Sequence, residues 1–242
     1  MTYLDYQATT PLAPEALEAM LPWLRDAHAN PHSPHRAGRA ARAAVEVARE
    51  EIAALLPPGG RVVFTSGATE ALNWAIKGTT GGVVTVATEH AAVLDTAASE
   101  ASRRDVRVIA VDAEGLVEPN DMPEDAQGGV GLVEAMLVNN EIGVVQPVAA
   151  IAARAHEAGA LFLCDAVQGY GRVPIPADCD LVAISAHKIH GPKGVGALWV
   201  RDGVALAPLL HGGDQEGGRS GTLSPALCAG FGVAARLMRE RA

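Results

Sequence analysis

The chain has 242 residues, of which 49% are hydrophobic and 19% are charged, a composition typical of a globular protein rather than a disordered one. Its formal net charge of −9 argues against sequence-independent nucleic-acid binding, which needs basic surfaces. No apolar run is long enough to span a bilayer, and the N-terminus lacks the pattern of a signal peptide, so we expect a cytoplasmic protein that binds neither nucleic acid nor a membrane.

Segments typical of strands and of helices alternate along the chain. In chain order we expect a helix at 36–56, strand 62–64, helix 70–77, strand 83–87, helix 90–103, strand 106–111, strand 132–138, helix 148–158, strands 160–164, 181–185 and 196–200, and a helix-like tail around Cys228. Residues 112–131 are rich in Pro, Gly and acidic side chains and are expected to be a surface excursion. This alternation predicts an α/β three-layer sandwich with a mainly parallel central sheet.

A lysine and an aspartate stand at the ends of two apolar runs. Lys188 follows the run 181–184, and Asp165 closes the run 160–164. A lysine there is costly to desolvate unless it is paired or used chemically, and a Schiff base with a carbonyl cofactor is such a use. Because pyridoxal phosphate needs a lysine for its aldehyde and an acid for its pyridinium nitrogen, we predict that cofactor. The alternatives are a lysine with a buried stem and an aspartate that caps a helix.

Other polar residues follow the predicted strands, where ligands of parallel sheets bind. They are Thr69, His90 and Asn140. Thr69 and the amide of Ala68 lie at a predicted helix N-terminus after a glycine, which is a favourable phosphate site, although an ordinary helix cap stays possible. His28, His32 and His35 crowd one loop, but their spacing matches no established metal-ligand pattern, so we expect no metal.

Several short motifs, spread over most of the chain in one order, resemble those of the cysteine desulfurase family within the class V aminotransferases. They are residues 3–11, 30–33, 35–38, 64–70, 88–94, 138–143, 165–168, 185–194 and 219–222. The resemblance implies an aspartate aminotransferase-like large domain at 16–242 behind an N-terminal arm at 1–15. It also implies removal of sulfur from L-cysteine to give alanine and a persulfide for iron–sulfur cluster or thio-cofactor synthesis, with a protein acceptor or scaffold as partner.

The resemblance also assigns roles to individual residues. Lys188 is expected to hold the cofactor and shuttle protons, and Asp165 to bind the pyridine nitrogen. His90 is expected to stack on the ring and assist proton transfer. The remaining cofactor contacts are expected from Ala68, Thr69, Asn140, Gln168, Ser185 and His187, with Asn140 also near the substrate carboxylate. Thr222 is expected to reach the phosphate of a neighbouring subunit, which implies a homodimer.

Two features of the family have no matching position in this sequence. They are an arginine for the substrate carboxylate and a mobile cysteine that takes up sulfur, both of which belong to a C-terminal small domain expected to be absent here. The three cysteines of the chain are poor substitutes. Cys164 lies in a predicted buried strand, Cys179 has an acidic residue on each side, and Cys228 lies in an apolar, helix-like tail. A selenocysteine lyase or aminotransferase of the same class, or a non-catalytic scaffold that binds pyridoxal phosphate, therefore stays open.

Overall fold

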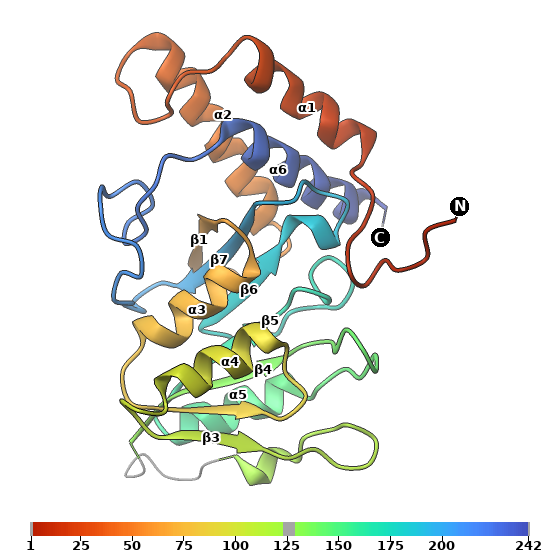
Figure 1. The fold of residues 1–242 in the computed structure, drawn as a ribbon, viewed down its shortest axis with the longest axis vertical. Helices are drawn as coiled ribbons and strands as arrows, with labels where there is room; N and C mark the ends of the chain where they lie inside the picture. The colour runs from red at the N-terminus through yellow and green to blue at the C-terminus, as the bar shows by residue number, and fades with distance from the viewer. Residues whose placement is uncertain (1, 123–128, 242) are drawn as a thin grey trace.

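The computed structural model describes residues 2–122 and 129–241. Its centre is a seven-stranded sheet in the order β1-β7-β6-β5-β4-β2-β3 (Figure 1). The strands are β1 (Gly60–Thr65), β2 (Gly82–Val86), β3 (Val106–Ile109), β4 (Val130–Met136), β5 (Leu161–Asp165), β6 (Leu181–Ser185) and β7 (Gly196–Arg201). Only β7 pairs antiparallel with its neighbours, β1 and β6, so the sheet is mainly parallel as predicted.

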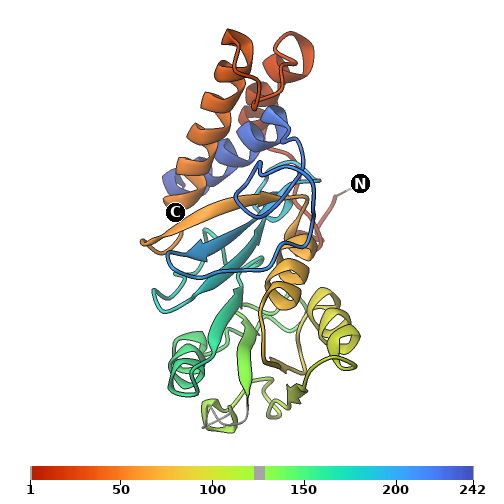
Figure 2. The ribbon, with the colours of Figure 1, turned by 90° about the vertical axis from the view of Figure 1, so that its left-hand side faces the viewer.

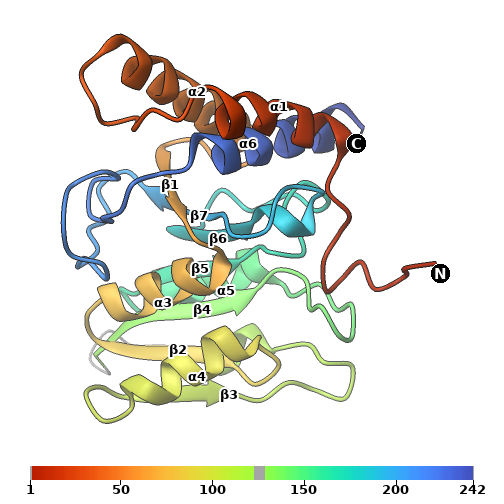
Figure 3. The same ribbon diagram turned by 45° about the horizontal axis from the view of Figure 1, so that its top comes forward.

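Helices cover both faces of this sheet (Figure 2). One face carries α3 (Ala68–Gly78) and α4 (Ala91–Glu100), and the other carries α2 (Arg36–Ala53), α5 (Val148–Glu157) and α6 (Pro225–Glu240). A further helix, α1 (Pro14–Arg25), lies outside this layer and packs on α6 (Figure 3). The three-layer sandwich is therefore confirmed.

Strand alternation divides the core between the two helical layers. Leu132 and Leu163 pack in the cluster beneath α3 and α4, whereas Val133 and Phe162 pack in the cluster beneath α2, α5 and α6. Successive side chains of a strand point to opposite faces, and both faces are covered, so the central strands read as nearly continuous apolar runs. The alternation therefore decides which face of the sheet each side chain at a strand end points to.

The predicted elements agree with the structure apart from end residues, one helix and one loop. Helix α1 was not predicted; proline at its first turn and another at Pro22 obscure its periodicity. Residues 112–131 are not simply a surface excursion, because Val117 and Met122 are buried in the core cluster. That loop includes a short 3-10 turn, Pro119–Asp121, and its residues 123–128 lie outside the described part of the chain.

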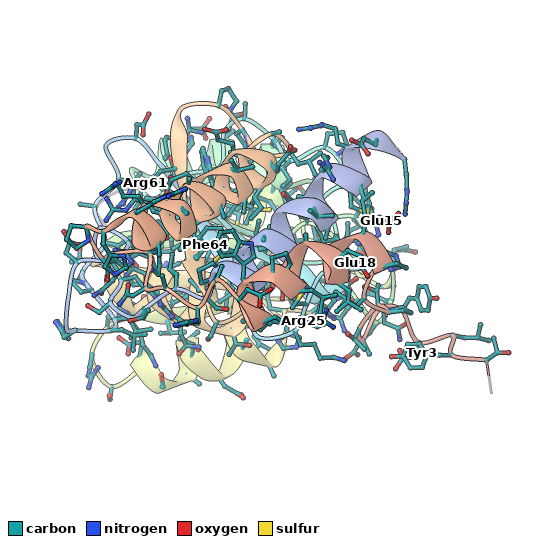
Figure 4. The ribbon with its side chains drawn as sticks, turned by 90° about the horizontal axis from the view of Figure 1, so that it is seen from above. Tyr3, Glu15, Glu18, Arg25, Arg61 and Phe64 are labelled. Carbon is teal, nitrogen blue, oxygen red and sulfur yellow. The ribbon has the colours of Figure 1, made fainter. Side chains whose placement is uncertain are left out.

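The segment before α1 extends away from the helical layer and passes the carboxyl end of β6 (Figure 1). Its outer end, at Tyr3, projects from the body of the molecule (Figure 4). No helix within residues 2–122 and 129–241 is long and apolar enough to cross a membrane.

Candidate active site

A cavity of about 610 Å³ opens where β4, β5 and β6 end and where α3 and α4 begin. The predicted site residues that line it are Ala68, Thr69, His90, Asn140, Asp165, Gln168, Ser185, His187 and Lys188. Thr222 does not line it and is exposed to solvent. The sheet therefore gathers into one cavity residues that are far apart in sequence.

Lys188 and Asp165 enter this cavity from neighbouring strands. Asp165 is the last residue of β5, and Lys188 ends the 3-10 turn Ala186–Lys188 that follows β6. The Lys188 Nζ donates a hydrogen bond to the carbonyl oxygen of Gln7. Burial lowers the pKa of Lys188, and the charge of Arg172 lowers it further, while Asp165 and Asp5 act in the opposite direction. The fold thus makes the neutral, nucleophilic amine more accessible here than in a free lysine.

The Asp165 carboxyl is almost fully enclosed, with 5% of the residue exposed. Its Oδ1 accepts a hydrogen bond of 2.9 Å from the Val167 amide. Burial raises the pKa of Asp165, while this hydrogen bond and the neighbouring His90 and Lys188 oppose the increase. A buried carboxylate of this kind is stabilised best by a cationic partner in the cavity.

His90 caps α4 and lines the cavity at the same time. Its Nδ1 accepts a hydrogen bond of 3.0 Å from the Ala92 amide. In the neutral ring the proton therefore resides on Nε2, since Nδ1 must offer a lone pair. One histidine therefore caps the helix and borders the cavity, and its stacking on a cofactor ring stays a prediction.

The turn between β1 and α3 presents an uncapped helix N-terminus to the cavity. Among the residues that the structure describes, no side chain caps α3 at Gly67, so amide groups of its first turn stay available for an anion. Gly196 on β7 packs directly beneath this turn, because a Cβ there would lie 2.7 Å from the Cα of Gly67. The phosphate site predicted around Ala68 and Thr69 is therefore geometrically reasonable.

The paired asparagines after β4 have different environments. Asn139 is buried; its Nδ2 donates to the Thr88 carbonyl at 2.7 Å, and its Oδ1 accepts from the amides of Glu141 and Ile142 at 2.8 and 3.0 Å. Asn140 is half-buried and lines the cavity. Asn139 therefore supports the loop, and Asn140 is the one available to a ligand.

Sequence reasoning missed the contacts that the N-terminal segment makes with the lysine turn. The Thr10 amide and Oγ1 both donate to the His187 carbonyl at 2.9 Å, and the Thr9 Oγ1 lies 3.1 Å from the His187 Nδ1. Gln168 Nε2 and Lys188 Nζ both donate to the Gln7 carbonyl, the former at 2.8 Å. The threonines stand in the motif 3–11, but only the fold brings them to residue 187.

His190, two residues beyond the lysine, is held in an unusual conformation. Its φ of 65° lies in the left-handed region that non-glycine residues rarely adopt. The Thr10 Oγ1 accepts from its amide at 2.7 Å, its carbonyl accepts from the Ala13 amide at 2.9 Å, and Tyr6 packs edge-on against its ring. The N-terminal segment thus stabilises a strained turn beside the site, a common location for such strain.

The loop that carries Thr222 is anchored to the start of α3. Arg219 forms an ion pair with Glu70, with 2.8 Å between Nε and Oε1, and Glu70 Oε2 accepts from the Ser66 amide at 2.7 Å. The hydrogen bonds with Arg219 and Ser66 outweigh the effect of burial and lower the pKa of Glu70. This contact fixes the loop relative to the α3 N-terminus while Thr222 stays exposed.

All three cysteines are buried. The interaction with Cys179 and burial raise the pKa of the Cys164 thiol, and burial raises the pKa of Cys228 to about 12. None of the three lines the cavity. This agrees with the expectation that they are poor sulfur acceptors.

A three-layer α/β fold with a lysine and a carboxylate in one cavity defines a candidate site for a carbonyl cofactor at the carboxyl ends of the strands. The aminotransferase class-V family model matches residues 2–241, and the chain belongs to that family. The resemblance found in the motifs is therefore confirmed, and at the family level the predicted cofactor is pyridoxal phosphate.

Its relatives include named cysteine desulfurases. The mitochondrial cysteine desulfurase of Candida maltosa is 44% identical over 254 residues, which cover 98% of this chain and 52% of the relative. Cysteine desulfurase IscS of Dictyoglomus turgidum is 43% identical, over 97% of this chain and 63% of the relative. The chain thus spans between about half and two thirds of the length of these curated relatives.

The solved structures agree with this placement. A structure described as SspA in complex with cysteine superposes with a TM-score of 0.92 and 40% identity, covering 97% of this chain and 72% of that one. A NifS-like protein gives a TM-score of 0.91 and 35% identity, covering 99% of this chain and 70% of the other.

Proposed function

We propose that this chain binds pyridoxal phosphate in the cavity and supplies the cofactor-binding part of a cysteine desulfurase. The observation that carries the proposal is the convergence of Lys188, Asp165 and the uncapped α3 N-terminus on one space of about 610 Å³. These groups match the aldehyde, ring nitrogen and phosphate of one molecule. When bound, the cofactor acts as an electron sink for a carbanion formed on the substrate.

The residues around the cavity divide the work of holding the cofactor. Lys188 Nζ would hold the aldehyde covalently, Asp165 would accept the ring N–H, and His90 would pack against the ring. Amides at Ala68 and Thr69, together with Ser185 and His187, would bind the phosphate. Asn140 and Gln168 would contact the ring hydroxyl. Support comes from their common cavity and from the match of residue types to the chemistry.

The proposed reaction transfers sulfur from L-cysteine to a thiol. The carbon–sulfur bond of cysteine breaks, a new sulfur–sulfur bond forms on the accepting thiol, and alanine leaves with the proton that replaces sulfur. Lys188 Nζ takes and returns the substrate α-proton, for which its lowered pKa is suited, and Asn140 orients the substrate carboxylate. Support for the substrate comes from the relatives named cysteine desulfurases and from the SspA structure with cysteine.

The accepting thiol is proposed to lie outside the three buried cysteines of this chain. Acceptance by a partner protein and delivery to iron–sulfur clusters or thio-cofactors belong to the same proposal. The proposal also includes a homodimer in which Thr222 serves the neighbouring site. It further includes a division into an arm at 1–15 and a large domain at 16–242, and a cytoplasmic location.

Titration with pyridoxal phosphate tests the proposal directly. We expect a visible absorption band, and we expect borohydride reduction followed by mass spectrometry to locate the cofactor on Lys188. Lys188→Ala should abolish both signals, whereas Lys193→Ala, which removes another lysine lining the cavity, should retain attachment at Lys188. Attachment to any other residue, or an unchanged spectrum in Lys188→Ala, would contradict the assignment.

Incubation with a thiol then separates the related activities. Alanine and sulfide from cysteine indicate a desulfurase, selenide from selenocysteine a lyase, and transfer to a keto acid an aminotransferase. Cofactor binding without any product would identify a scaffold.

A further inference from the structure

Thr10 is a buried polar residue on an otherwise exposed N-terminal segment, and the proposed chemistry does not use it. Residues 2–8 are exposed and Thr9 is half-buried, whereas Thr10 is only 5% exposed. Buried polar side chains have hydrogen-bond partners in the large majority of cases. The partners of Thr10 belong to the turn that carries Lys188.

The Thr10 hydroxyl bridges the two sides of this lysine. Its Oγ1 donates to the His187 carbonyl at 2.9 Å and accepts from the His190 amide at 2.7 Å. A hydroxyl can donate one hydrogen bond and accept another at the same time. The Thr10 amide donates to the same His187 carbonyl at 2.9 Å. Without the hydroxyl, the His187 carbonyl would therefore keep a donor, whereas the His190 amide would lose its acceptor.

His190 depends on this acceptor because its backbone is strained. Its φ of 65° lies in a region that persists at a non-glycine residue only when the surroundings hold it. The His190 carbonyl accepts from the Ala13 amide at 2.9 Å, and the Lys188 carbonyl accepts from Arg172 Nη2 at 2.6 Å. These contacts fix the main chain on both sides of the lysine.

We propose that Thr10 is a positioning residue whose hydroxyl locks the turn 187–190, so that the Lys188 amine is presented to the cavity at a fixed place. The same segment also holds the amine itself, because Lys188 Nζ donates to the Gln7 carbonyl, which accepts from Gln168 Nε2 at 2.8 Å as well. Bond formation requires the reacting atoms to be held in a narrow range of positions. The effect on cofactor attachment rests on the proposed function; the lock on the turn does not.

Two substitutions separate the hydroxyl from the shape of the side chain. Thr10→Val replaces the hydroxyl with a methyl group of similar size, and Thr10→Ser keeps the hydroxyl. The matched control is Thr79→Val. Thr79 is also buried, but its hydroxyl donates to the Ile76 carbonyl at 3.1 Å at the end of α3, outside the cavity.

Amide hydrogen exchange of the cofactor-free chain, followed by NMR, tests the lock on the turn. Removal of the acceptor should make local opening easier, so we expect the His190 amide to exchange about tenfold faster in Thr10→Val than in the parent. Thr10→Ser and Thr79→Val should both exchange at close to the parental rate.

If Thr10→Val does not fold, Thr10→Ala is compared with Thr10→Ser, since that pair differs in the same hydroxyl. Exchange of the His190 amide at the parental rate in whichever hydroxyl-free variant folds would overturn the lock.

Two ligands then distinguish positioning of the lysine from general damage to the cavity. Pyridoxal phosphate carries the aldehyde with which Lys188 reacts, whereas pyridoxine phosphate carries an alcohol there and binds without a covalent bond. We expect Thr10→Val to slow attachment to Lys188 by about ten- to a hundredfold and to leave the dissociation constant of pyridoxine phosphate unchanged. Thr10→Ser should recover the attachment rate.

The positioning role would be overturned by a parental attachment rate in Thr10→Val, by an equal loss of pyridoxine phosphate affinity, or by a serine variant that does not recover. If the parent chain binds neither ligand, the proposed function fails, and exchange at His190 still decides the lock on the turn.

Discussion

The two faces of the central sheet are built from the same strands but end differently. On the face covered by α3 and α4, apolar residues give way to Thr85, Glu134, Asp165 and Ser185 near the carboxyl ends. On the opposite face the corresponding side chains, Val86, Ala135, Cys164 and Ile184, all belong to the buried apolar cluster. Because strand alternation assigns neighbouring residues to opposite faces, chemistry and packing are separated by a single position along each strand.

Substitution on the apolar face should have the largest effect on stability. Phe162 is 0% exposed, and Phe162→Ala is expected to lower the free energy of unfolding by about 3–5 kcal/mol through lost burial and a cavity. Urea unfolding measures the change, with Phe162→Leu as a milder control. A loss below about 1 kcal/mol would show that this face does not provide the main packing.

Substitution on the polar face, at Asp165 at the end of the same strand, should affect binding instead of stability. Asp165→Asn removes a carboxyl whose pKa is raised by burial, so stability is not expected to fall. Loss of a charge-assisted hydrogen bond should weaken pyridoxal phosphate binding by about 1.5–3 kcal/mol, roughly ten- to hundredfold. Spectrophotometric titration checks the affinity. Equal affinity in parent and variant would remove Asp165 from the site.

The pH dependence of cofactor attachment reports on the lysine of the polar face. Burial lowers the pKa of Lys188 from 10.5, so the attachment rate should rise with pH and level off below that value, because only the neutral amine reacts. Arg172→Gln removes a charge that lowers this pKa and should move the profile to higher pH. A profile unaffected by Arg172→Gln would contradict this electrostatic account.

The smallest effect concerns the cysteines, whose sulfur atoms belong to the packed interior. Cys164, Cys179 and Cys228 are all buried, so a thiol reagent at pH 8 should modify the native chain slowly and the urea-unfolded chain at once. Counting modified thiols by mass spectrometry checks the difference. Immediate reaction of one native thiol would identify an accessible sulfur acceptor within this chain.

Much of the site was predictable because its motifs stand directly after strands. Lys188, Asp165 and His90 follow apolar runs whose type and order the sequence pattern indicates, and parallel strands bring such ends together. Glu134 was also visible as an acidic residue in the predicted strand 132–138. Its proximity to Glu89 and Asp165 could not be predicted, because that proximity depends on the register of the strands.

Contacts between distant segments could not be predicted in the same way. Thr10 meets residue 187 only because α1 packs on α6 and sends the N-terminal segment across the end of β6. Helix α1 itself was missed, since its two prolines weaken the helical pattern. The burial of Val117 and Met122 likewise depends on packing that local composition does not reveal.

Local patterns along the chain indicate the α/β class, the strand ends and the family motifs, because hydrophobic periodicity and turn residues are local properties. Tertiary structure decided which side chains share the cavity and which asparagine faces it. Those outcomes depend on strand order and on register, and a shift of one residue would have sent the same side chains to the opposite face.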